Sequence, residues 1–598
     1  MSILSAHRVA VVDKENCQSK RCNLECINFC PVNKNGYNCI VLNEEERALI
    51  SEELCTGCGI CVKKCPFEAI TIVNLPHELG EEKIHQYGVN SFRLYRLPLP
   101  KVGSVVGLVG RNGIGKSTAI SVLAGLIKPN FGEVGKELSW EEIVDNIRDK
   151  ELKEHFEKLS SKKLRASFKP QYIYLLPQFW SKDVRSLIDK KDEKGEKNYI
   201  IEELNLRNSL DKKLSELSGG ELQRVAIALC YLKDAEIYFF DEPSSYNDVY
   251  QRLKVSRIIR SLAEKKKAII VVEHDITLLD YLSDYIHILY GEQGVYGIVS
   301  NRLNSKSGIN YLLDGYLPPE NVRFRDIALS FEIYSPIEEA VKRKAIASYS
   351  NLKKSHSSFT LSVNRGEIME GEVVGILGAN ALGKSTFVKM VAGVEKPDEG
   401  EIFIGAKISY KPQYLNPAYE ESVQSLLEKT VGQRYLDSYF QSNLILPLKV
   451  HKLFDKNVKD LSGGELQKVA ITLCLLRDVK IYVLDEPSAF IDVEDRLVLG
   501  RALQKLVKDQ GNSALVVDHD IFLIDMIADS LLIFKGEPSE RGEVIGPLSK
   551  REGMNLFLKE LEITYRRDKD SKRPRVNKPQ SRLDREQKEK GEYYYSFF

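Results

Sequence analysis

The pattern of apolar and polar positions occurs twice along the chain. In each half an apolar run leads into a glycine-rich loop, a helical pattern follows the residues LSGGE, and a further apolar run ends in Asp-Glu-Pro. The paired segments are GRNGIGKST and GANALGKST, LQRVAIALCYL and LQKVAITLCLL, and IYFFDEP and IYVLDEP. Short continuous apolar runs are typical of strands buried on both faces, and the spaced apolar residues predict helices. The pattern therefore predicts two copies of one α/β domain.

The two copies differ in length between the glycine-rich loop and a shared KPQY segment. The loops lie 268 residues apart (110 to 378) and the glutamines of KPQY 242 apart (171 to 413), so the first copy holds about 26 extra residues. We expect them within 139–168, where Ser139 and Glu142 form a capping-box pattern. Apolar residues recur there near helical spacing: Ile143, Ile147, Leu152, Phe156 and Leu159. These features predict a projecting helix–loop–helix with a basic segment, SSKKLRASFK, which is either a surface decoration or a docking element for an anionic partner.

Length and composition favour a modular globular protein. The chain has 598 residues, 43% hydrophobic and 29% charged, which is too long for one core. No apolar run approaches the roughly 18 to 20 residues that cross a bilayer, and the start lacks a signal peptide, so we expect a cytoplasmic protein. The net charge is +1, but residues 565–590 carry eleven Lys or Arg against five Asp or Glu. This basic segment is a plain tail, packs across both domains, or meets RNA phosphate.

Nine of the eleven cysteines fall within the first 65 residues. One run, closed by Pro66, has the spacing that binds a 4Fe–4S cluster in bacterial ferredoxins, and an earlier run closed by Pro31 has looser gaps. The runs are Cys55, Cys58, Cys61 and Cys65, and Cys17, Cys22, Cys26 and Cys30. In two-cluster ferredoxins the fourth cysteine of each run binds the other run's cluster, so we pair Cys30 with the later run and Cys65 with the earlier one. Cys39 is left over.

A structural zinc site is the competing interpretation of these cysteines. Zinc usually takes four ligands in two separated pairs, whereas two dense quartets each closed by Cys-Pro favour clusters. Two clusters could carry electrons or hold a small domain together, and the sequence leaves both roles open.

Each glycine-rich loop meets the P-loop rule for binding nucleotide phosphates. The glycines let backbone N–H groups face the phosphates, Lys116 reaches the β and γ oxygens, and the Ser117 hydroxyl binds Mg²⁺. A lone P-loop pattern arises by chance, but its recurrence excludes chance here. The nucleotide-binding residues of the two loops are Gly110, Asn112, Gly113, Gly115, Lys116, Ser117 and Thr118, and Gly378, Asn380, Gly383, Lys384, Ser385 and Thr386.

The ordered features after each P-loop resemble those of ABC-type ATPases. That resemblance implies that Glu242 and Glu486 polarise the attacking water and that His274 and His519 contact the γ-phosphate. It assigns Gln171 and Gln413 to the loop that senses Mg²⁺ and the γ-phosphate, and it places Asp241 and Asp485 at the Mg²⁺ shell. It also implies a head-to-tail arrangement, in which each ATP lies between one P-loop and the signature of the other domain. The signature residues are Ser218, Gly219, Gly220 and Glu221, and Ser462, Gly463, Gly464 and Glu465.

Two further observations concern the aromatic contact to adenine and the residue differences between the two ATPase copies. Tyr87 is a candidate for stacking on adenine, although a core tyrosine is an alternative, and Phe359 stands at a comparable position in the second domain. Ala381 replaces the glycine found at Gly113, and Ser245-Tyr246-Asn247 replaces Ala489-Phe490-Ile491. We therefore expect unequal turnover at the two sites.

The whole chain resembles the ABC-E family, the archaeal and eukaryotic ribosome-recycling factors also called RNase L inhibitor. The resemblance rests on two cysteine quartets, twin ABC domains, the insertion, the hinge DGYLPPENVRF and the tail RPRVNKPQSRLDREQ, and the cysteine segment fits an archaeal member. It implies a multidomain α/β fold, with a ferredoxin-like two-cluster domain followed by two ABC-type P-loop ATPase domains. The expected boundaries are 1–75 for the iron–sulfur domain, 76–310 for the first ATPase domain, 311–328 for the hinge, 329–550 for the second ATPase domain and 551–598 for the basic tail.

The resemblance implies ATP-driven splitting of ribosomes after termination or stalling, with closure of the ATP sites swinging the cluster domain. The implied cofactors are two 4Fe–4S clusters and Mg²⁺, with ATP as substrate. The implied partners are the ribosome, especially its small subunit and rRNA, a release factor or its surveillance relative, and initiation factors. We expect a monomer without a membrane partner. Two alternatives stay open: an ATP-gated electron-transfer protein, and the soluble ATPase of a transporter.

Overall fold

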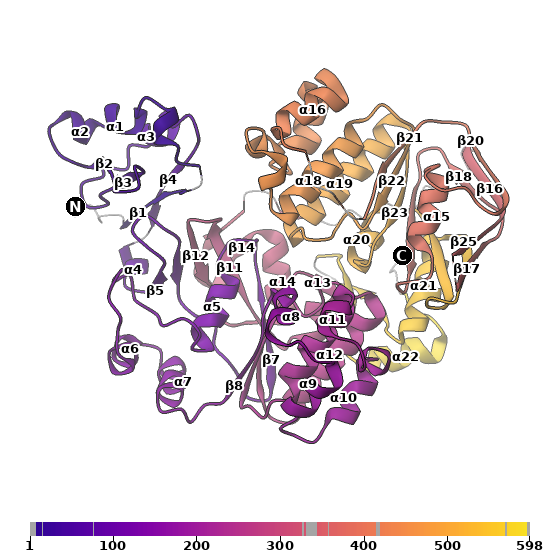
Figure 1. The fold of residues 1–598 in the computed structure, drawn as a ribbon, viewed down its shortest axis with the longest axis horizontal. Coiled ribbons are helices and arrows are strands. Elements are labelled where there is room, and N and C mark those ends of the chain that lie inside the picture. Colours follow the sequence, from indigo (N-terminus) through magenta and orange to yellow (C-terminus); the bar gives the residue numbers. More distant parts are fainter. Residues whose placement is uncertain are drawn as a thin grey trace. The chain divides into compact units, whose positions relative to one another are not determined.

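The computed structural model describes residues 7–14, 16–75, 77–325, 328–329, 344–356, 358–413, 415, 419–568 and 571–594 (Figure 1). The chain divides into two compact units. The first comprises Met1–Pro243, Ile258–Glu273 and Leu282–Asp326, and the second comprises Ser244–Arg257, His274–Tyr281 and Ile327–Phe598. Within the described part of the chain, no helix is both long and apolar enough to span a membrane.

The first unit begins with a small cysteine-rich domain. Strand β1 (His7–Val12) pairs antiparallel with β4 (Ile70–Leu75), and β2 (Ile40–Leu42) pairs with β3 (Ala48–Ile50). The domain also has three short helices, α1 (Glu25–Asn28), α2 (Pro31–Lys34) and α3 (Ile60–Lys64), and Cys26 lies in α1 and Cys61 in α3. Five of the cysteines are buried among apolar residues of the strands, so this small domain has its core around them.

One asparagine ties the cysteine-rich domain to the rest of the first unit. The Asn90 side chain is 3% exposed and donates to the Ala10 and Ile50 carbonyls, both at 3.0 Å. Its carbonyl oxygen accepts from the Ile50 N–H at 2.7 Å. Because all three bonds are buried, the two parts are joined by a fully satisfied polar contact rather than by the chain connection alone.

The first ATPase domain is built on parallel strands, as the apolar runs predict. Strands β8, β9 and β10 pair in parallel, and β7 pairs in parallel with β11. The remaining strands extend the β11 sheet in the order β13-β11-β12-β6-β5. The bounds are β5 Lys83–Gln86, β6 Arg93–Tyr95, β7 Ser104–Val109, β8 Ala166–Lys169, β9 Ile237–Asp241, β10 Ala268–Val272, β11 Tyr285–Glu292, β12 Tyr296–Val299 and β13 Leu303–Asn304.

The helices of this domain are α4 His77–Gly80, α5 Lys116–Leu123, α8 Leu176–Phe179, α9 Val184–Lys191, α10 Lys197–Glu203, α11 Gly219–Leu232 and α14 Ser305–Asp314. Helices α12 (Val249–Glu264) and α13 (Ile276–Leu282) each include residues of both units. The short pair β14 (Tyr316–Leu317) and β15 (Val322–Arg323) lies in the expected hinge segment.

The inserted segment forms the expected helix–loop–helix. Helix α6 (Trp140–Asn146) begins with the capping box of Ser139 and Glu142, and α7 (Lys150–Ser160) follows. Ile143 and Phe156 are fully buried against the same core as the helix after the P-loop. The basic segment SSKKLRASFK is not a surface element throughout, since it ends in β8 and its last residue, Lys169, is 1% exposed.

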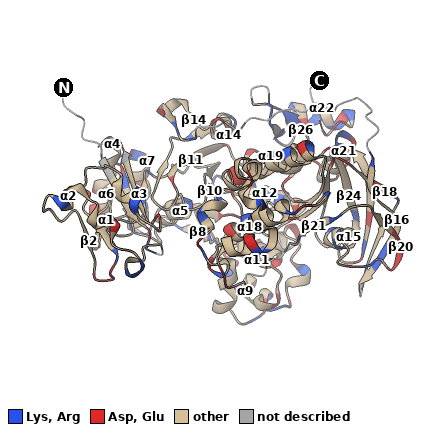
Figure 2. Cartoon of the chain, turned by 90° about the horizontal axis from the view of Figure 1, so that it is seen from above, with Lys and Arg blue, Asp and Glu red and all other residues tan. Residues whose placement is uncertain are grey.

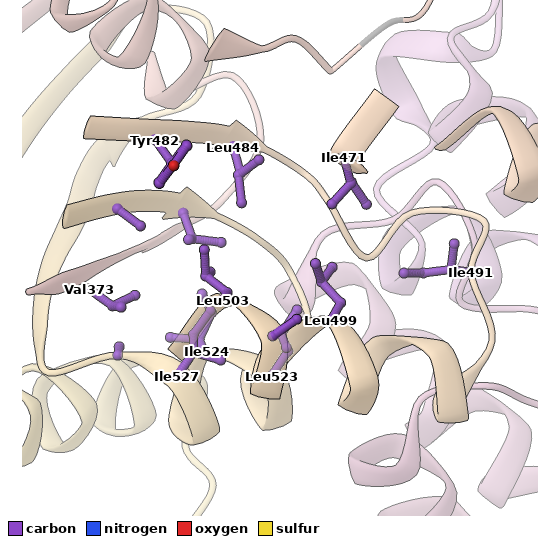
Figure 3. Packing of buried hydrophobic residues seen from close by; sticks show 14 of the residues in the cluster. Val373, Ile471, Tyr482, Leu484, Ile491, Leu499, Leu503, Leu523, Ile524 and Ile527 are labelled. Atoms are coloured by element: carbon purple, nitrogen blue, oxygen red, sulfur yellow. The ribbon is translucent and has the colours of Figure 1, made fainter. Parts of the chain in front are cut away.

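The second unit contains a sheet in the order β18-β16-β17-β25-β24-β19-β23-β22-β21, with β20 paired to β16. Alternate residues of β22 face opposite layers: Tyr482 and Leu484 contact one apolar cluster, and Ile481 and Val483 the other. Figure 3 shows the first cluster between the sheet and the helices that carry Leu499, Leu503, Leu523 and Ile527. The sheet is therefore covered by apolar side chains on both faces, as its continuous apolar strands predict.

The strands of this unit are β16 Ala345–His356, β17 Phe359–Val363, β18 Gly366–Met369, β19 Val373–Gly378, β20 Glu399–Ile404, β21 Ile408–Lys411, β22 Ile481–Asp485, β23 Ser513–Val517, β24 Ser530–Glu537, β25 Arg541–Ser549, β26 Tyr565–Arg567 and β27 Pro574–Val576. The helices are α15 Lys384–Val391, α16 Val423–Val431, α17 Ser438–Phe440, α18 Gly463–Leu476, α19 Val493–Gln510, α20 Ile521–Ile527, α21 Lys550–Leu561 and α22 Arg582–Lys590.

The basic tail packs by ion pairs within the second unit. Arg573 and Arg575 both bind Asp280 of α13, at 3.1 Å and 2.9 Å. Arg567 binds Asp525 of α20 at 2.9 Å, and Tyr594 donates to the same carboxylate. Asp280 follows His274 by as many residues as Asp525 follows His519. Arginines of the hairpin β26–β27 therefore bind aspartates at corresponding positions of the two copies. Arg582, Arg585 and Lys590 of α22 are exposed, and the basic positions of this helix are blue in Figure 2.

Candidate functional site

Each P-loop connects the end of a buried strand to the start of a helix. Lys116, the first residue of α5, donates from Nζ to the carbonyls of Gly110 at 2.9 Å and Arg111 at 2.7 Å. Lys384 of α15 makes the same contacts, to Gly378 at 3.0 Å and Ala379 at 2.6 Å. Each lysine therefore reaches back over its own loop, where a phosphate held by the loop N–H groups would lie.

The loops differ at one strained position. Gly113 has a φ of 69°, which glycine adopts freely, whereas Ala381 has a φ of 60° at the corresponding place. A left-handed residue with a Cβ costs about 1–2 kcal/mol, so the second loop holds its shape at a cost that the first avoids.

The two aspartates at the strand ends are buried next to the hydroxyls of the P-loop serines. Burial raises the pKa of Asp241 to about 6, while a hydrogen bond from Ser117 acts in the opposite direction. Burial likewise raises the pKa of Asp485, opposed by Ser385. Among the described residues, Asp241 Oδ1 and both carboxylate oxygens of Asp485 lack a close hydrogen-bond partner. A buried carboxylate beside a hydroxyl, with unshared oxygens, fits the oxygen ligands that Mg²⁺ prefers.

The glutamates and glutamines predicted for the two sites meet in pairs. Gln171 donates from Nε2 to Glu242 Oε1 at 2.7 Å, and Gln413 donates to Glu486 Oε1 at 2.7 Å. In the second site His519 Nε2 lies 3.4 Å from Glu486 Oε1. His274 is also buried, and it belongs to the second unit whereas Glu242 belongs to the first.

Charge around Glu486 favours its ionised form. Burial alone would raise its pKa, but His519, Gln413 and Lys384 outweigh burial and lower the pKa to about 2. Lys384 is shifted in the complementary sense, because burial lowers its pKa to about 8 despite the carboxylates around it. The site therefore concentrates fixed charge in a place that water reaches poorly.

Sequence reasoning missed two residues in each copy, a lysine and a glutamine, that donate hydrogen bonds to main-chain carbonyls at the glutamate. Lys169 donates to the carbonyl of Asp241 at 2.7 Å, and Gln223 of α11 donates to the carbonyl of Glu242 at 2.7 Å. Lys411 and Gln467 repeat both contacts in the second copy, at 2.8 Å and 2.7 Å. Burial lowers the pKa of Lys169 and of Lys411 to about 8. The repeated KPQY and LSGGELQ segments were the available signal, since each contains one of these residues.

The signature residues begin the long helices α11 and α18. Ser218 caps α11 by accepting from the Glu221 N–H, and Ser462 caps α18 by accepting from the Glu465 N–H. The two glutamates complete these capping boxes. The pKa of Glu221 falls to about 2 because its hydrogen bonds, above all those with Ser218, outweigh burial. Gly464 lets the Phe490 main chain approach the start of α18, because an added Cβ would lie 2.7 Å from the Phe490 carbonyl oxygen.

The aromatic candidates for adenine do not occupy corresponding positions. Tyr87 is 56% exposed, and its hydroxyl lies 3.0 Å from Thr118 Oγ1, so it is a surface residue beside the first P-loop rather than a core tyrosine. Phe359 packs against Gly383, where an added Cβ would lie 2.9 Å from its ring. Phe92 packs against Gly115 in the same way. The counterpart of Phe359 is therefore Phe92, and its expected match to Tyr87 is wrong.

The cysteines form two groups that draw on both sequence runs. A pocket is lined by Cys17, Cys22, Cys26 and Cys65, together with Pro66 and neighbouring residues. Burial raises the pKa of Cys26 to about 12, with contributions from these three neighbours. Burial raises the pKa of Cys61 to about 11, and its thiol neighbours are Cys55, Cys58 and Cys30. Each group thus takes its fourth cysteine from the other run.

This arrangement suits clusters better than single ions. Within the described ranges, no three His, Cys, Asp or Glu side chains are close enough to hold one metal ion. A 4Fe–4S cube spreads its four cysteine ligands around an object larger than a single ion. Cys39 is buried next to Cys30 and Cys55, and burial raises its pKa to about 12.

Family comparisons match the same regions. A family model described as "ABC transporter" matches residues 100–245 and 361–489. A family model described as "Possible Fer4-like domain in RNase L inhibitor, RLI" matches residues 7–38. Another, described as "4Fe-4S binding domain", matches residues 48–71. The expected order of one cluster-binding domain and two ATPase domains is thereby confirmed.

Relatives match the chain over almost its full length. An uncharacterized ABC transporter ATP-binding protein of Methanocaldococcus jannaschii is 49% identical, over 98% of this chain and 97% of the relative. The translation initiation factor RLI1 of Chaetomium thermophilum is 44% identical, over 98% of this chain and 97% of the relative.

Two solved structures are similar at 49% identity. In a model of ribosome-bound archaeal Pelota and ABCE1, the match covers 99% of this chain and 100% of the other, with a TM-score of 0.92. In a complex of the archaeal ribosomal stalk protein aP1 with the archaeal ribosome recycling factor aABCE1, it covers 87% of this chain and 100% of the other, with a TM-score of 0.84.

Proposed function

The chain belongs to the ABC-E family, the RNase L inhibitor family, and on this premise we propose that it splits ribosomes into their subunits after termination or stalling. ATP hydrolysis by its two ABC domains supplies the free energy. The observation that carries this proposal is the correspondence of the cysteine-rich domain and both ATPase domains with an archaeal ABCE1 on the ribosome beside Pelota. Fold alone would not assign this function, because ABC domains serve many activities.

At each ATP site the residues of this chain position the phosphates and the attacking water. The P-loop N–H groups and Lys116 or Lys384 bind the phosphates, and Glu242 or Glu486 orients and polarises the water. Mg²⁺, when bound with ATP, neutralises charge on the phosphates. It would be held by Ser117, Gln171 and Asp241 in one site and by Ser385, Gln413 and Asp485 in the other. His274 and His519 would contact the γ-phosphate, and the signature serines and glycines would complete the opposite site.

A short path of contacts connects the first P-loop with the cysteine-rich domain. Phe92 packs against Gly115 at the start of α5. Two residues before it, Asn90 makes its three buried hydrogen bonds to strands of the cysteine-rich domain. We infer that a change of shape at the P-loop moves the cluster domain as a rigid lever, with the clusters holding the lever together rather than passing electrons.

The proposed ligands are Cys17, Cys22, Cys26 and Cys65 for one cluster and Cys30, Cys55, Cys58 and Cys61 for the other. Ligating cysteines must lose their protons, so the high thiol pKa values caused by burial are overcome when iron binds. Because the two clusters exchange their fourth ligands, losing one cluster also frees a cysteine beside the other.

Paired cysteine substitutions test this exchange of ligands. Cys30→Ser with Cys58→Ser removes two ligands of one cluster, so we expect about four irons per chain to remain. Cys65→Ser with Cys58→Ser removes one ligand from each, so we expect iron to fall close to zero. Iron content and visible absorbance of the purified variants measure both. Cys39→Ser is the matched control and should keep about eight irons. The reverse result for the two pairs would show that each run binds its own cluster.

Ribosome splitting is tested with the full-length protein, ribosomes and release factor of its source organism, and ATP. Density gradients should show subunits in place of whole ribosomes only when ATP is present and both clusters are intact. The Cys65→Ser, Cys58→Ser variant is the control for the clusters, and Glu242→Gln and Glu486→Gln, singly and together, show which site limits the cycle. Intact ATP turnover without binding or splitting of ribosomes would contradict the proposal.

Two further measurements separate the alternatives. An electron-transfer protein would show reversible cluster reduction that changes with nucleotide, and a transporter ATPase would co-purify with a membrane protein. We propose a cytoplasmic location and a monomer, with the small subunit, rRNA, a release factor or its surveillance relative, and initiation factors as partners. The exposed basic residues of α22 are the candidate contacts to RNA phosphate.

A further inference from the structure

The glutamates of both ATP sites sit at a strained turn in the backbone. Glu242 has a φ of 47° and Glu486 a φ of 48°, in the left-handed region that residues with a Cβ disfavour. Such strain persists only where surrounding contacts hold it, and it recurs here at the same place in both copies. Contacts that hold this turn therefore also decide where the carboxylate points.

In each copy, one lysine side chain donates hydrogen bonds to the carbonyl oxygens of this turn. Lys169, at the end of β8, donates to the carbonyls of Asp241 at 2.7 Å and Glu242 at 3.3 Å. Lys411, at the end of β21, donates to those of Asp485 at 2.8 Å and Glu486 at 3.3 Å. Both lysines are 1% exposed. A buried charge is costly unless it is hydrogen-bonded, and these carbonyls supply the bonds.

In each copy, a glutamine from the signature helix donates a further hydrogen bond to the same turn. Gln223 donates to the carbonyl of Glu242 at 2.7 Å, and Gln467 to that of Glu486 at 2.7 Å. The carboxylate on the other side of the turn accepts from Gln171 or Gln413 at 2.7 Å. Backbone and side chain of each glutamate are thus fixed by three side chains of its own domain, two from the end of one strand and its following loop and one from the signature helix.

We propose that Lys169 and Lys411, with Gln223 and Gln467, are positioning residues that fix the strained turn and so aim the glutamate carboxylates at the attacking water. The inference rests on the proposed role of the glutamates in ATP hydrolysis. Neither lysine touches the reacting atoms, since its ammonium group is turned to the main chain. Its effect is on the placement of the carboxylate, where an error of about 1 Å can cost about 10²-fold in rate.

The test replaces both lysines, because the chain has two sites. Lys169→Met with Lys411→Met keeps the side-chain length and removes the donor. We expect kcat for ATP hydrolysis to fall by about 10²-fold while KM for ATP changes less than about threefold. The matched control is Lys163→Met with Lys407→Met, two exposed lysines that precede the same strands, and it should keep wild-type kcat.

Coupling to the glutamates separates positioning from a merely structural role. In a Glu242→Gln, Glu486→Gln background, the lysine substitutions should lower kcat by less than about threefold further, since the group they aim is already absent. Gln223→Met with Gln467→Met leaves the lysines in place and should lower kcat in the same way, which keeps the test valid if the lysine variant does not fold.

Four outcomes decide the inference. Unchanged kcat in folded lysine and glutamine variants would overturn it, as would a joint loss of kcat, ATP affinity and melting temperature in both. If hydrolysis survives in Glu242→Gln, Glu486→Gln, the assignment of the glutamates itself fails. If hydrolysis is lost there but survives in the lysine and glutamine variants, only the positioning inference fails.

Discussion

Replacing Glu242 and Glu486 together by glutamine is expected to slow ATP hydrolysis by about 10²–10⁴-fold while ATP still binds. Each carboxylate already accepts a hydrogen bond from the glutamine of its own domain at 2.7 Å. The low pKa of Glu486, about 2, keeps it ionised at neutral pH, because His519, Gln413 and Lys384 outweigh burial. A carboxylate of this kind is a weak base, so its contribution is to orient and polarise water, which an amide does poorly.

Phosphate release from the double variant measures this effect, and fluorescent-nucleotide binding shows that the sites remain formed. Glu264→Gln with Glu540→Gln is the matched control, because both side chains are exposed and distant in sequence from the motifs. If ATP turnover of the Glu242→Gln, Glu486→Gln variant stays within a factor of about three of wild type, the catalytic assignment of these glutamates is contradicted. Loss of binding together with turnover would instead point to damage at the P-loops.

Asp280→Leu is expected to release the tail hairpin β26–β27 from its site. Asp280 is 2% exposed and binds Arg573 and Arg575, and the Arg573 side chain is fully buried. Removing one partner of a buried ion pair leaves an uncompensated charge and typically costs about 3–5 kcal/mol. Hydrogen exchange in β26 and β27 should therefore accelerate by about 10²–10⁴-fold, since each 1.4 kcal/mol is about tenfold.

Asp314→Asn, at an exposed position, is the control for the tail measurement. The wild-type protein should also show a pH dependence at the same place. Burial would raise the pKa of Asp280, but Arg573 and Arg575 outweigh it and hold the pKa below its usual value. The stabilisation is thus present above the unfolded-state pKa of about 3.9 and is lost as pH falls through the lower folded-state pKa. Unchanged exchange in Asp280→Leu would show that the ion pairs do not hold the tail.

The tail contacts connect two positions that the repeat makes equivalent. Asp280 and Asp525 stand at the same distance after His274 and His519, and arginines of one short hairpin bind both. The tail therefore forms buried ion pairs with helices that begin next to both histidines. The sequence left open a plain tail, packing across both domains or contact with RNA phosphate. The structure shows Arg567, Arg573 and Arg575 packed within the second unit, whereas Arg582, Arg585 and Lys590 of α22 are exposed.

Local sequence patterns determined most of the elements. Apolar runs marked the strands that end at Asp241 and Asp485. The capping pair of Ser139 and Glu142 marked the start of α6, and the helical patterns after LSGGE marked α11 and α18. These predictions succeed because a strand buried on both faces and a capped helix are specified by residues close together in the chain. The order of domains was determined in the same way, by cysteine spacing and by the repeated ATPase motifs.

Tertiary structure alone decided which distant residues meet. Lys169 looked like part of a basic surface segment, yet it ends a central strand and is buried against Asp241. Phe359 looked comparable to Tyr87, yet its packing matches that of Phe92. A charge run or an aromatic residue has the same local pattern whether it faces water or the core. The difference arises from strand pairing and burial between segments far apart in sequence, which local periodicity does not encode.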